Sequence, residues 1–331
     1  MAESSKQTLT ISTVNLIQKY TPWLYSFWKF SRPHTIFGTS FSVLGLTLVA
    51  WSDKINATWQ DGDFVATALI TLLISWLACL CGNVYIVGLN QLEDIEIDRI
   101  NKPHLPLASG EYSPFQAKAI IITTGILAII LAALQGKFLL ATVGISLALG
   151  TAYSLPPIRL KRFPFWAALC IFTVRGVIVN LGLYLHFSWV FSEKMPGNLP
   201  NLTPSILALT LFILVFTFAI AIFKDIPDIE GDRQYNITTF TIRLGTLAVF
   251  NLARWVLTGC YLGMMVAPVF LQAWVNPIFL VVSHLVILCL MWWRSGKVDL
   301  EKKSEIASFY QFIWKLFFLE YLMFPLACLL G

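Results

Sequence analysis

The sequence has 331 residues, of which 57% are hydrophobic and only 12% are charged, and its mean hydropathy is +0.73. Soluble domains carry about 25% charged residues, so this composition excludes a soluble protein and indicates an integral membrane protein. The net charge of +5 comes from Lys and Arg residues scattered over loops, without the contiguous basic run that would indicate a nucleic-acid-binding protein. The six cysteines lie in apolar segments, without the spacing of a disulfide framework or a zinc site.

The first 31 residues precede the first long apolar stretch. Aromatic residues from Trp23 to Phe30 are interleaved there with Lys19 and Lys29, a mixture typical of a helix that lies in the membrane interface. The segment has neither the basic-then-apolar pattern of a cleaved signal nor an Arg-rich transit sequence. We therefore expect residues 1–31 to be an interfacial segment and residues 32–331 to form one membrane domain.

The remaining chain contains nine apolar stretches on the measure that about twenty apolar residues cross a bilayer. They are expected at residues 36–51, 65–89, 115–134, 138–154, 165–186, 204–223, 246–267, 270–293 and 309–330. Most Lys and Arg residues between them lie on the side of the N-terminus, and the opposite side holds only Lys54, Lys137 and Lys194. Because cytoplasmic loops are enriched in Lys and Arg, the N-terminus is expected in the cytoplasm and the C-terminus on the opposite side. The sequence thus predicts an all-α integral membrane protein.

A first acidic segment, residues 90–98, directly follows the second span. Its polar residues Asn90, Asp94 and Asp98 are spaced by four and would share one face of a helix. Clustered carboxylates repel one another unless a cation lies among them. Mg²⁺ commonly binds one or two carboxylates together with the phosphates of a substrate, so this spacing is a candidate magnesium site.

A second acidic segment, residues 224–232, follows the sixth span on the same side of the membrane. On a helix, Asp225, Asp228 and Asp232 would converge, although Pro227 blocks a regular helix there and favours a kink or loop. One acidic segment after a span is as readily a solvated loop as a site. Two at matching positions favour a function, since ionisable groups at the membrane edge are usually functional. The residues therefore predict a Mg²⁺–diphosphate site shared by two halves of a membrane protein.

Polar and basic residues near the two acidic segments are candidates for binding the diphosphate. They are Lys102 in the Pro-rich loop 101–111, Lys224 in the second segment, and Tyr153, Arg159, Lys161 and Arg162 in the fourth connection. For Arg159 and Arg162, the alternative is a role in topology or contact with lipid headgroups.

Arg175 lies in the middle of the fifth span, without an acidic residue in the same apolar stretch. A charged arginine at such a depth costs about 2.5–3.5 kcal/mol on insertion scales, so it requires a partner. The candidates are the carboxylate of a substrate and an Asp of one acidic segment, with a structural salt bridge or bonds to backbone carbonyls as the alternative. Asn180, five residues further along, is a candidate for the same site.

These motifs resemble those of the UbiA-type intramembrane prenyltransferase superfamily. Its members are nine-helix proteins with N-x-x-x-D-x-x-x-D after the second helix and D-x-x-x-D after the sixth, which stand here as Asn90/Asp94/Asp98 and Asp228/Asp232. Further segments are similar to the homogentisate prenyltransferase branch of the superfamily, namely residues 87–92, 98–103, 105–111 and 224–228. The short N-terminus resembles that of a cyanobacterial form.

The resemblance implies nine helices around a central cavity, with the motif-bearing loops on the cytoplasmic side. It implies Mg²⁺ as cofactor, and its ligands would be Asn90, Asp94, Asp98, Asp225, Asp228 and Asp232. It also implies transfer of a phytyl group from phytyl diphosphate to homogentisate, with decarboxylation, to give a methyl-phytyl-benzoquinol in tocopherol synthesis.

In the reaction that the resemblance implies, four residues are expected to be catalytic: Asp94, Asp98, Asp228 and Asp232. The predicted substrate-binding residues are Asn90, Lys102, Tyr153, Arg159, Lys161, Arg162, Arg175, Asn180 and Lys224, with Arg175 assigned to the homogentisate carboxylate. Membrane lipid is the expected surrounding, in the thylakoid or plasma membrane of a cyanobacterium. Neither nucleic acid nor an obligate protein partner is expected.

Three alternatives stay open at this point. The enzyme could use a geranylgeranyl or solanesyl donor, or another acceptor such as chlorophyllide. The acidic segments could instead be coupling-ion sites of a transporter, although such sites usually lie near the membrane midplane. Here they lie at span ends beside cationic loops, which favours a diphosphate enzyme. A purely structural membrane protein is the third alternative.

Overall fold

The computed structural model describes residues 20–52, 62–192, 200–226, 229 and 239–331, and every regular element among these residues is a helix. Nine helical segments in this part of the chain are long and apolar enough to cross a membrane. They are α3 (Pro33–Ser52), α5 (Gly62–Glu93), α8 (Pro114–Gln135), α9 (Lys137–Ser154), α10–η2–α11 (Pro164–Ile171, Phe172–Ile178 and Val179–Phe191), α12 (Pro204–Lys224), α15–α16 (Thr246–Val266 and Pro268–Leu271), α17 (Pro277–Ser295) and α18 (Lys303–Leu329). The prediction of an all-α protein with nine spans is confirmed.

The helix boundaries differ most from the predicted ones at the eighth span. The sequence predicts this span over residues 270–293, whereas α17 begins at Pro277 and residues 268–271 belong to the preceding span. The Asn276 side chain accepts a hydrogen bond of 3.0 Å from the backbone N–H of Phe279. Asparagine at the N-cap followed by proline at the first helical position favours a helix start. Asn276 and Pro277 therefore begin a helix and do not interrupt one.

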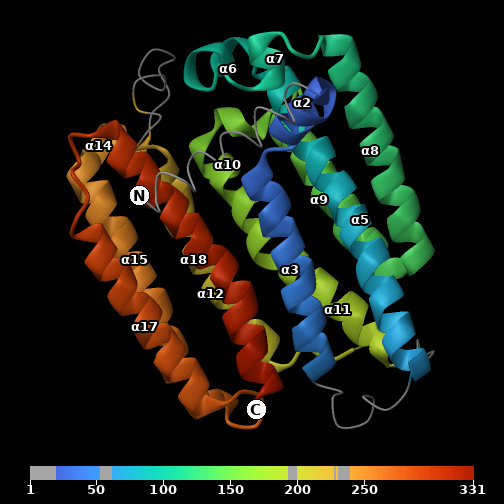
Figure 1. The fold of residues 1–331 in the computed structure, drawn as a ribbon, viewed down its shortest axis with the longest axis vertical. Coiled ribbons are helices and arrows are strands. Elements are labelled where there is room, and N and C mark those ends of the chain that lie inside the picture. Colours follow the sequence, from blue (N-terminus) through green and yellow to red (C-terminus); the bar gives the residue numbers. More distant parts are fainter. Residues whose placement is uncertain (1–19, 53–61, 193–199, 227–228, 230–238) are drawn as a thin grey trace.

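Neighbouring helices pack so that the first and last spans meet and close the bundle (Figure 1). The helix α5 packs against α8 and α9, α11 packs against α3, and α3 packs against α18. In the other half, α12 packs against α15, and α15 against α17. At Gly45, α3 approaches the backbone oxygen of Tyr321 in α18 so closely that a Cβ atom has no room. This close approach fixes the two terminal spans against each other.

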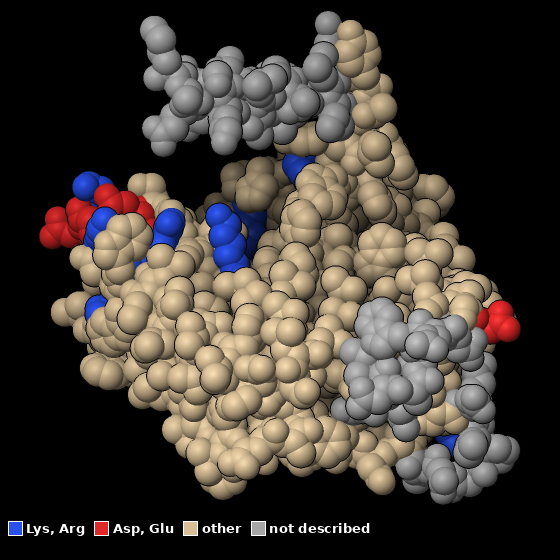
Figure 2. Space-filling view, turned by 60° about the horizontal axis from the view of Figure 1, so that its bottom comes forward, with Lys and Arg blue, Asp and Glu red and all other residues tan. Residues whose placement is uncertain are grey.

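The sides of the bundle expose large apolar side chains. Phe115, Leu134, Phe270 and Ile278 are each at least 74% exposed. In Figure 2, most of the Lys and Arg side chains in view lie toward one end, where several line a recess, and the broad middle of the described surface is uncharged. An apolar belt with charges at its end is the surface of a multi-pass membrane protein.

Short helices cover the end of the bundle at which the first acidic segment lies (Figure 1). They are α2 (Pro22–Phe30), α6 (Ile95–Asn101) and α7 (Pro106–Ser109). The Tyr112 hydroxyl donates a 3.0 Å hydrogen bond to the backbone oxygen of Trp23 and so attaches α2 to the start of α8. Residues 1–19 of the predicted interfacial segment lie outside the described residues. The interfacial position of α2, which exposes Trp23 and Trp28, stays a prediction.

Candidate active site

The first acidic motif begins in α5 and ends in α6. Asn90 lies in the last turn of α5, Asp94 interrupts the helix with φ −116° and ψ 19°, and Asp98 lies in α6. The prediction of one unbroken helix is therefore wrong at Asp94. The three side chains nevertheless remain neighbours, because the backbone N–H of Asp98 still donates to the backbone oxygen of Asp94 at 2.7 Å. The Asn90 Nδ2 donates to Asp94 Oδ2 at 3.0 Å.

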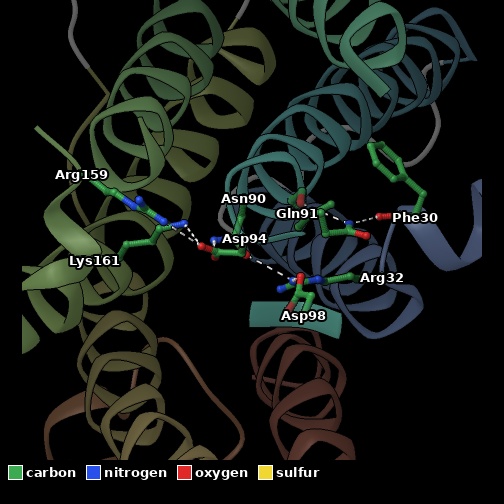
Figure 3. A network of polar contacts seen from close by, with 9 residues as sticks. Phe30, Arg32, Asn90, Gln91, Asp94, Asp98, Arg159 and Lys161 are labelled. Atoms are coloured by element: carbon green, nitrogen blue, oxygen red, sulfur yellow. Dashed lines mark hydrogen bonds and ion pairs between the residues drawn. The ribbon is translucent and has the colours of Figure 1, made fainter. Parts of the chain in front are cut away.

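Arg32 joins the two ends of this motif (Figure 3). Its Nη2 donates to Asn90 Oδ1 at 3.2 Å and lies 3.8 Å from Asp98 Oδ2. The backbone of Arg32 has φ 51°, which is unfavourable for a residue with a Cβ atom. Such conformations tend to occur at functional sites. Gln91 holds the chain two residues before Arg32, because its Nε2 donates to the Phe30 backbone oxygen at 2.7 Å. Arg32 is not among the predicted site residues, and its available signal in the sequence was an arginine directly before a proline at the membrane edge.

Asp94 is paired with two of the predicted diphosphate-binding cations (Figure 3). Arg159 Nη2 lies 3.2 Å and Lys161 Nζ 2.7 Å from its Oδ1. Arg159 has φ 38°, and this turn precedes the short helix η1 (Leu160–Arg162) that carries Lys161. Burial lowers the pKa of Lys161, although its bond to Asp94 opposes the shift. The structure therefore brings the acidic motif and the fourth connection together, as the sequence predicts for a diphosphate site.

Asp98 is 5% exposed, and its Oδ2 accepts no hydrogen bond from the described residues. Burial raises the pKa of this carboxyl, although the charges of Arg32 and Lys102 oppose the shift. A buried carboxylate oxygen without a hydrogen bond, next to a second carboxylate and an amide oxygen, fits the preference of Mg²⁺ for oxygen ligands. Nowhere in the described part of the chain do three His, Cys, Asp or Glu side chains converge. A metal held by this motif would therefore need ligands from the substrate or from the rest of the chain.

The second acidic segment begins where α12 ends. Lys224 is the last residue of α12, and its Nζ lies 3.9 Å from the carboxylate of Asp225. Asp228 and Asp232 lie outside the described residues, so their convergence with the first motif stays a prediction.

Tyr153 lies in the last turn of α9. The charges of Asp94, from the first segment, and of Lys224, from the second, both act on it. Lys102 follows α6, and its backbone N–H donates to the backbone oxygen of Asp98 at 2.7 Å. The charge of Lys102 also acts on the Asp98 carboxyl. Arg162 is exposed and makes no ion pair with another described residue. The structure thus gathers Tyr153 and Lys102 around the motif and leaves Arg162 outside it.

Arg175 lies in the π-helical segment η2 and faces aromatic rings of α18. Its Cζ lies 4.7 Å from the centroid of the Trp314 ring and 5.7 Å from that of Phe317. Among the described residues, this guanidinium has no acidic partner and makes no hydrogen bond. Its N–H groups are therefore available for an acidic ligand, while the two rings stabilise its charge.

Asn180 is fully buried and bonded on both sides of its amide. Its Nδ2 donates to the backbone oxygens of Gly176 at 2.8 Å and Arg175 at 3.2 Å, and its Oδ1 accepts from the Tyr321 hydroxyl at 2.8 Å. The Asn180 side chain therefore contacts the backbone of the segment that carries Arg175 and is enclosed by protein.

His34 links the two parts of the site, and the sequence analysis did not single it out. Its ring centroid lies 5.4 Å from that of Trp314, and the charges of Arg32, Lys102 and Arg175 all act on it. The cations around the acidic motif and the arginine of the fifth span therefore border one region. A histidine beside Arg-Pro at the membrane edge was the available signal.

The comparisons with known proteins agree with this geometry. The model of the UbiA prenyltransferase family matches residues 35–316. The chain is 55% identical to homogentisate phytyltransferase of Synechocystis sp., over 92% of this chain and 96% of that protein. It is 40% identical to homogentisate phytyltransferase 1, chloroplastic, of Arabidopsis thaliana, over 91% and 75%. It is 36% identical to a homogentisate geranylgeranyltransferase of Triticum aestivum, over 93% and 74%.

The structure of a UbiA homolog from Archaeoglobus fulgidus bound to GPP and Mg²⁺ has the same fold. It matches with a TM-score of 0.60 and 15% identity, over 92% of this chain and 100% of that one. The helical bundle and the acidic motif with its paired cations define a multi-pass membrane enzyme of the prenyltransferase class. The chain belongs to the UbiA prenyltransferase family. This confirms the resemblance, and the comparisons give no support to a transporter.

Proposed function

We propose that the protein transfers a phytyl group from phytyl diphosphate to the ring of homogentisate, with loss of CO₂. The observation that carries the proposal is the pairing of Asp94 with Arg159 and Lys161 at the membrane edge. It combines oxygen ligands for a cation with positive charges for a diphosphate at one point. The similarity to homogentisate phytyltransferases, at 55% and 40% identity, supports this donor over geranylgeranyl, at 36%.

The proposed metal is Mg²⁺, held by the carboxylate and amide oxygens of the two acidic segments. Its ligands would be Asn90, Asp94, Asp98, Asp225, Asp228 and Asp232. When bound, Mg²⁺ would neutralise the diphosphate and make it a better leaving group. The buried Oδ2 of Asp98, which accepts no hydrogen bond from a described residue, supports this assignment.

The cations around the motif would bind the diphosphate oxygens and stabilise the charge that they gain. Arg159, Lys161 and Arg32 contact side chains of the first motif, Lys102 acts on Asp98 through its charge, and Lys224 lies beside Asp225 of the second segment. The carbon–oxygen bond of the donor breaks with its electron pair on the diphosphate, which leaves an allylic cation. Preorganised positive charges stabilise such a leaving group without reorganisation during the reaction.

The acceptor ring then forms a carbon–carbon bond with the allylic cation and loses its ring proton. The carboxylate leaves as CO₂, and the methylene carbon that carried it takes up one proton, so the exchange is balanced in protons. We assign Arg175 to the homogentisate carboxylate, because its guanidinium faces rings and has no acidic partner among the described residues. Trp314 would offer a ring face both to this arginine and to the developing cation.

For the orientation, we propose a cytoplasmic N-terminus and a C-terminus on the opposite side, in the thylakoid or plasma membrane of a cyanobacterium. In Figure 1 the C-terminus lies at the end of the bundle opposite α6 and α7, as an odd number of spans requires. The Lys and Arg bias of the loops supports the cytoplasmic assignment of the α6 end. Cysteine labelling of an Arg99→Cys variant in oriented vesicles, with the native cysteines replaced, tests this assignment.

The activity is tested with purified protein in lipid, homogentisate and Mg²⁺, with phytyl, geranylgeranyl and solanesyl diphosphate in separate reactions. Mass spectrometry of the quinol identifies the donor. We expect a methyl-phytyl quinol that disappears with EDTA and in Asp94→Asn. Glu96→Gln is the matched control, since Glu96 is exposed in the same segment and its ion-pair partner among the described residues is Arg99. A larger product yield from another donor would replace phytyl, and product formation by Asp94→Asn at the wild-type rate would refute the site.

A further inference from the structure

The segment that carries Arg175 is a π-helix, and this geometry decides where the arginine lies. Over Phe172–Ile178 the helix is wider than an α-helix, and the N–H of Val179 donates to the oxygen of Val174, five residues back. Such a segment contains an extra residue, and each residue of a helix turns the chain by about 100°. If η2 relaxed to a regular α-helix, the side chain of Arg175 would rotate away from Trp314 and Phe317. π-Helical turns are less stable than α-helical ones, so this turn requires support from its surroundings.

The support comes from two buried side chains. Asn180 donates to the oxygens of Arg175 and Gly176, within the π-helical turn itself. Its own oxygen accepts from the Tyr321 hydroxyl at 2.8 Å. Both Asn180 and Tyr321 are 0% exposed, so water does not replace these bonds.

Tyr321 is itself held in place and belongs to the same helix face as the rings beneath Arg175. Trp314, Phe317 and Tyr321 are spaced by three and four residues, so they share one face of α18. The backbone of Tyr321 is fixed by its close approach to Gly45 in α3. One face of α18 therefore contacts both the guanidinium and the amide that supports its backbone.

We propose that Asn180 and Tyr321 are positioning residues, whose hydrogen bond maintains the π-helical turn and so holds Arg175 where it selects an acceptor that carries a carboxylate. The inference rests on the proposed binding of the homogentisate carboxylate by Arg175. It assigns Asn180 an indirect role, in place of the direct substrate contact that the sequence suggests. Neither residue touches the substrate in this arrangement.

The test is a set of variants assayed for the KM of each substrate separately. Tyr321→Phe removes one hydroxyl, and Tyr261→Phe is its matched control. Tyr261 is also 0% exposed, and its hydroxyl has no hydrogen-bond partner among the described residues. We expect Tyr321→Phe to raise the KM for homogentisate about three- to tenfold, the range for loss of one buried hydrogen bond. The KM for phytyl diphosphate should stay unchanged, and Tyr261→Phe should leave both values unchanged.

A double-variant cycle with Arg175→Leu separates positioning from general stability. If Tyr321 acts through Arg175, adding Tyr321→Phe to Arg175→Leu should not raise the KM for homogentisate further. Equal effects of Tyr321→Phe with and without Arg175 would overturn the proposal. So would equal increases in both KM values, or failure of Tyr321→Phe to fold, since these would assign the hydroxyl to the stability of the whole bundle.

The cycle also distinguishes this inference from the proposed function. If Arg175→Leu raises the KM for homogentisate and Tyr321→Phe does not, the positioning role is wrong and the carboxylate assignment stands. If Arg175→Leu leaves this KM unchanged in an enzyme that still forms the phytyl quinol, Arg175 does not bind the acceptor, and both assignments are wrong. Neither result affects the test of the donor or of the acidic motif.

Discussion

Replacing Glu111 should release α2 from the bundle and weaken binding of the prenyl diphosphate. Glu111, between α7 and α8, accepts a hydrogen bond of 2.5 Å from Ser26 and pairs with Lys29, both in α2. The chain that follows α2 leads directly to Arg32, which bridges the acidic motif. Glu111→Ala should therefore raise the KM for phytyl diphosphate and leave that for homogentisate unchanged.

The size of the effect follows from the exposure of the groups. The side chains of Lys29 and Glu111 are 18% and 34% exposed, so their ion pair is partly screened by solvent. Such a pair contributes about 0.2–1 kcal/mol, and a hydrogen bond to a charged group about 1.5–3 kcal/mol. Since the unfolded or detached state regains solvent contacts, we expect Glu111→Ala to cost about 1–3 kcal/mol of local stability, and Lys29→Met alone less than about 1 kcal/mol.

The same contact should depend on pH. Burial raises the pKa of Glu111, but the bonds from Lys29 and Ser26 outweigh burial and hold it below its ordinary value of 4.5. A carboxyl with a lowered pKa in the folded state stabilises that state above its unfolded pKa, and the contribution is lost as the pH falls through its folded pKa. The contact is therefore fully formed at neutral pH and should open only below about pH 4.5.

Hydrogen exchange of the amides of residues 23–31, in lipid at neutral pH, measures this local opening directly. Glu111→Ala should speed their exchange, and Glu96→Ala, which removes an exposed carboxylate, should not. The effects of Glu111→Ala and Lys29→Met should be less than additive in the double variant. Unchanged exchange in Glu111→Ala would show that the apolar contacts of α2 hold it alone, and the reasoning would be refuted.

Three further predictions concern packing and charge. Gly45→Ala should lower the thermal stability in detergent by about 1–3 kcal/mol, because the added methyl meets the backbone oxygen of Tyr321, and an unchanged unfolding temperature would contradict the packing of α3 on α18. Asp94→Asn should abolish Mg²⁺-dependent transfer. Without Mg²⁺ this variant should bind pyrophosphate more tightly than the wild type, because Arg159 and Lys161 lose their acidic partner. Weaker binding of pyrophosphate in calorimetry would argue against this pairing. Arg99→Ala should change stability by less than about 0.5 kcal/mol, since its ion pair within the described part of the chain is an exposed one with Glu96, and a larger shift in the unfolding temperature would be inconsistent with that exposure.

The number of spans and the position of the first motif could be predicted from the sequence, because long apolar runs and clustered acids are local signals. The break at Asp94 could not, since Asn90, Asp94 and Asp98 have a regular helical spacing, and Asp94 is paired with Arg159 and Lys161, which are distant in the sequence.

Other features depend on residues far apart in the chain. Arg32 acts on a motif about sixty residues away, and no local pattern indicates this pairing. The π-helical turn at Arg175 has no local signal either, because its support comes from Tyr321 at the other end of the chain. The environment of Asp228 and Asp232 lies outside the described residues and stays a prediction.

Asp94 is shared by Arg159 and Lys161, and this sharing affects which anions can bind these two cations. Its carboxylate pairs with both Arg159 and Lys161, so an anion that approaches these cations alone must compete with that carboxylate. The membrane surface around this site is crowded with lipid phosphates, which would otherwise occupy free cations. Under the proposed role of Asp94 as a Mg²⁺ ligand, an anion that arrives with its own divalent cation would give Asp94 a substitute partner while it binds Arg159 and Lys161. In the proposed site, metal and diphosphate would therefore bind together, and each should raise the affinity for the other by the same factor.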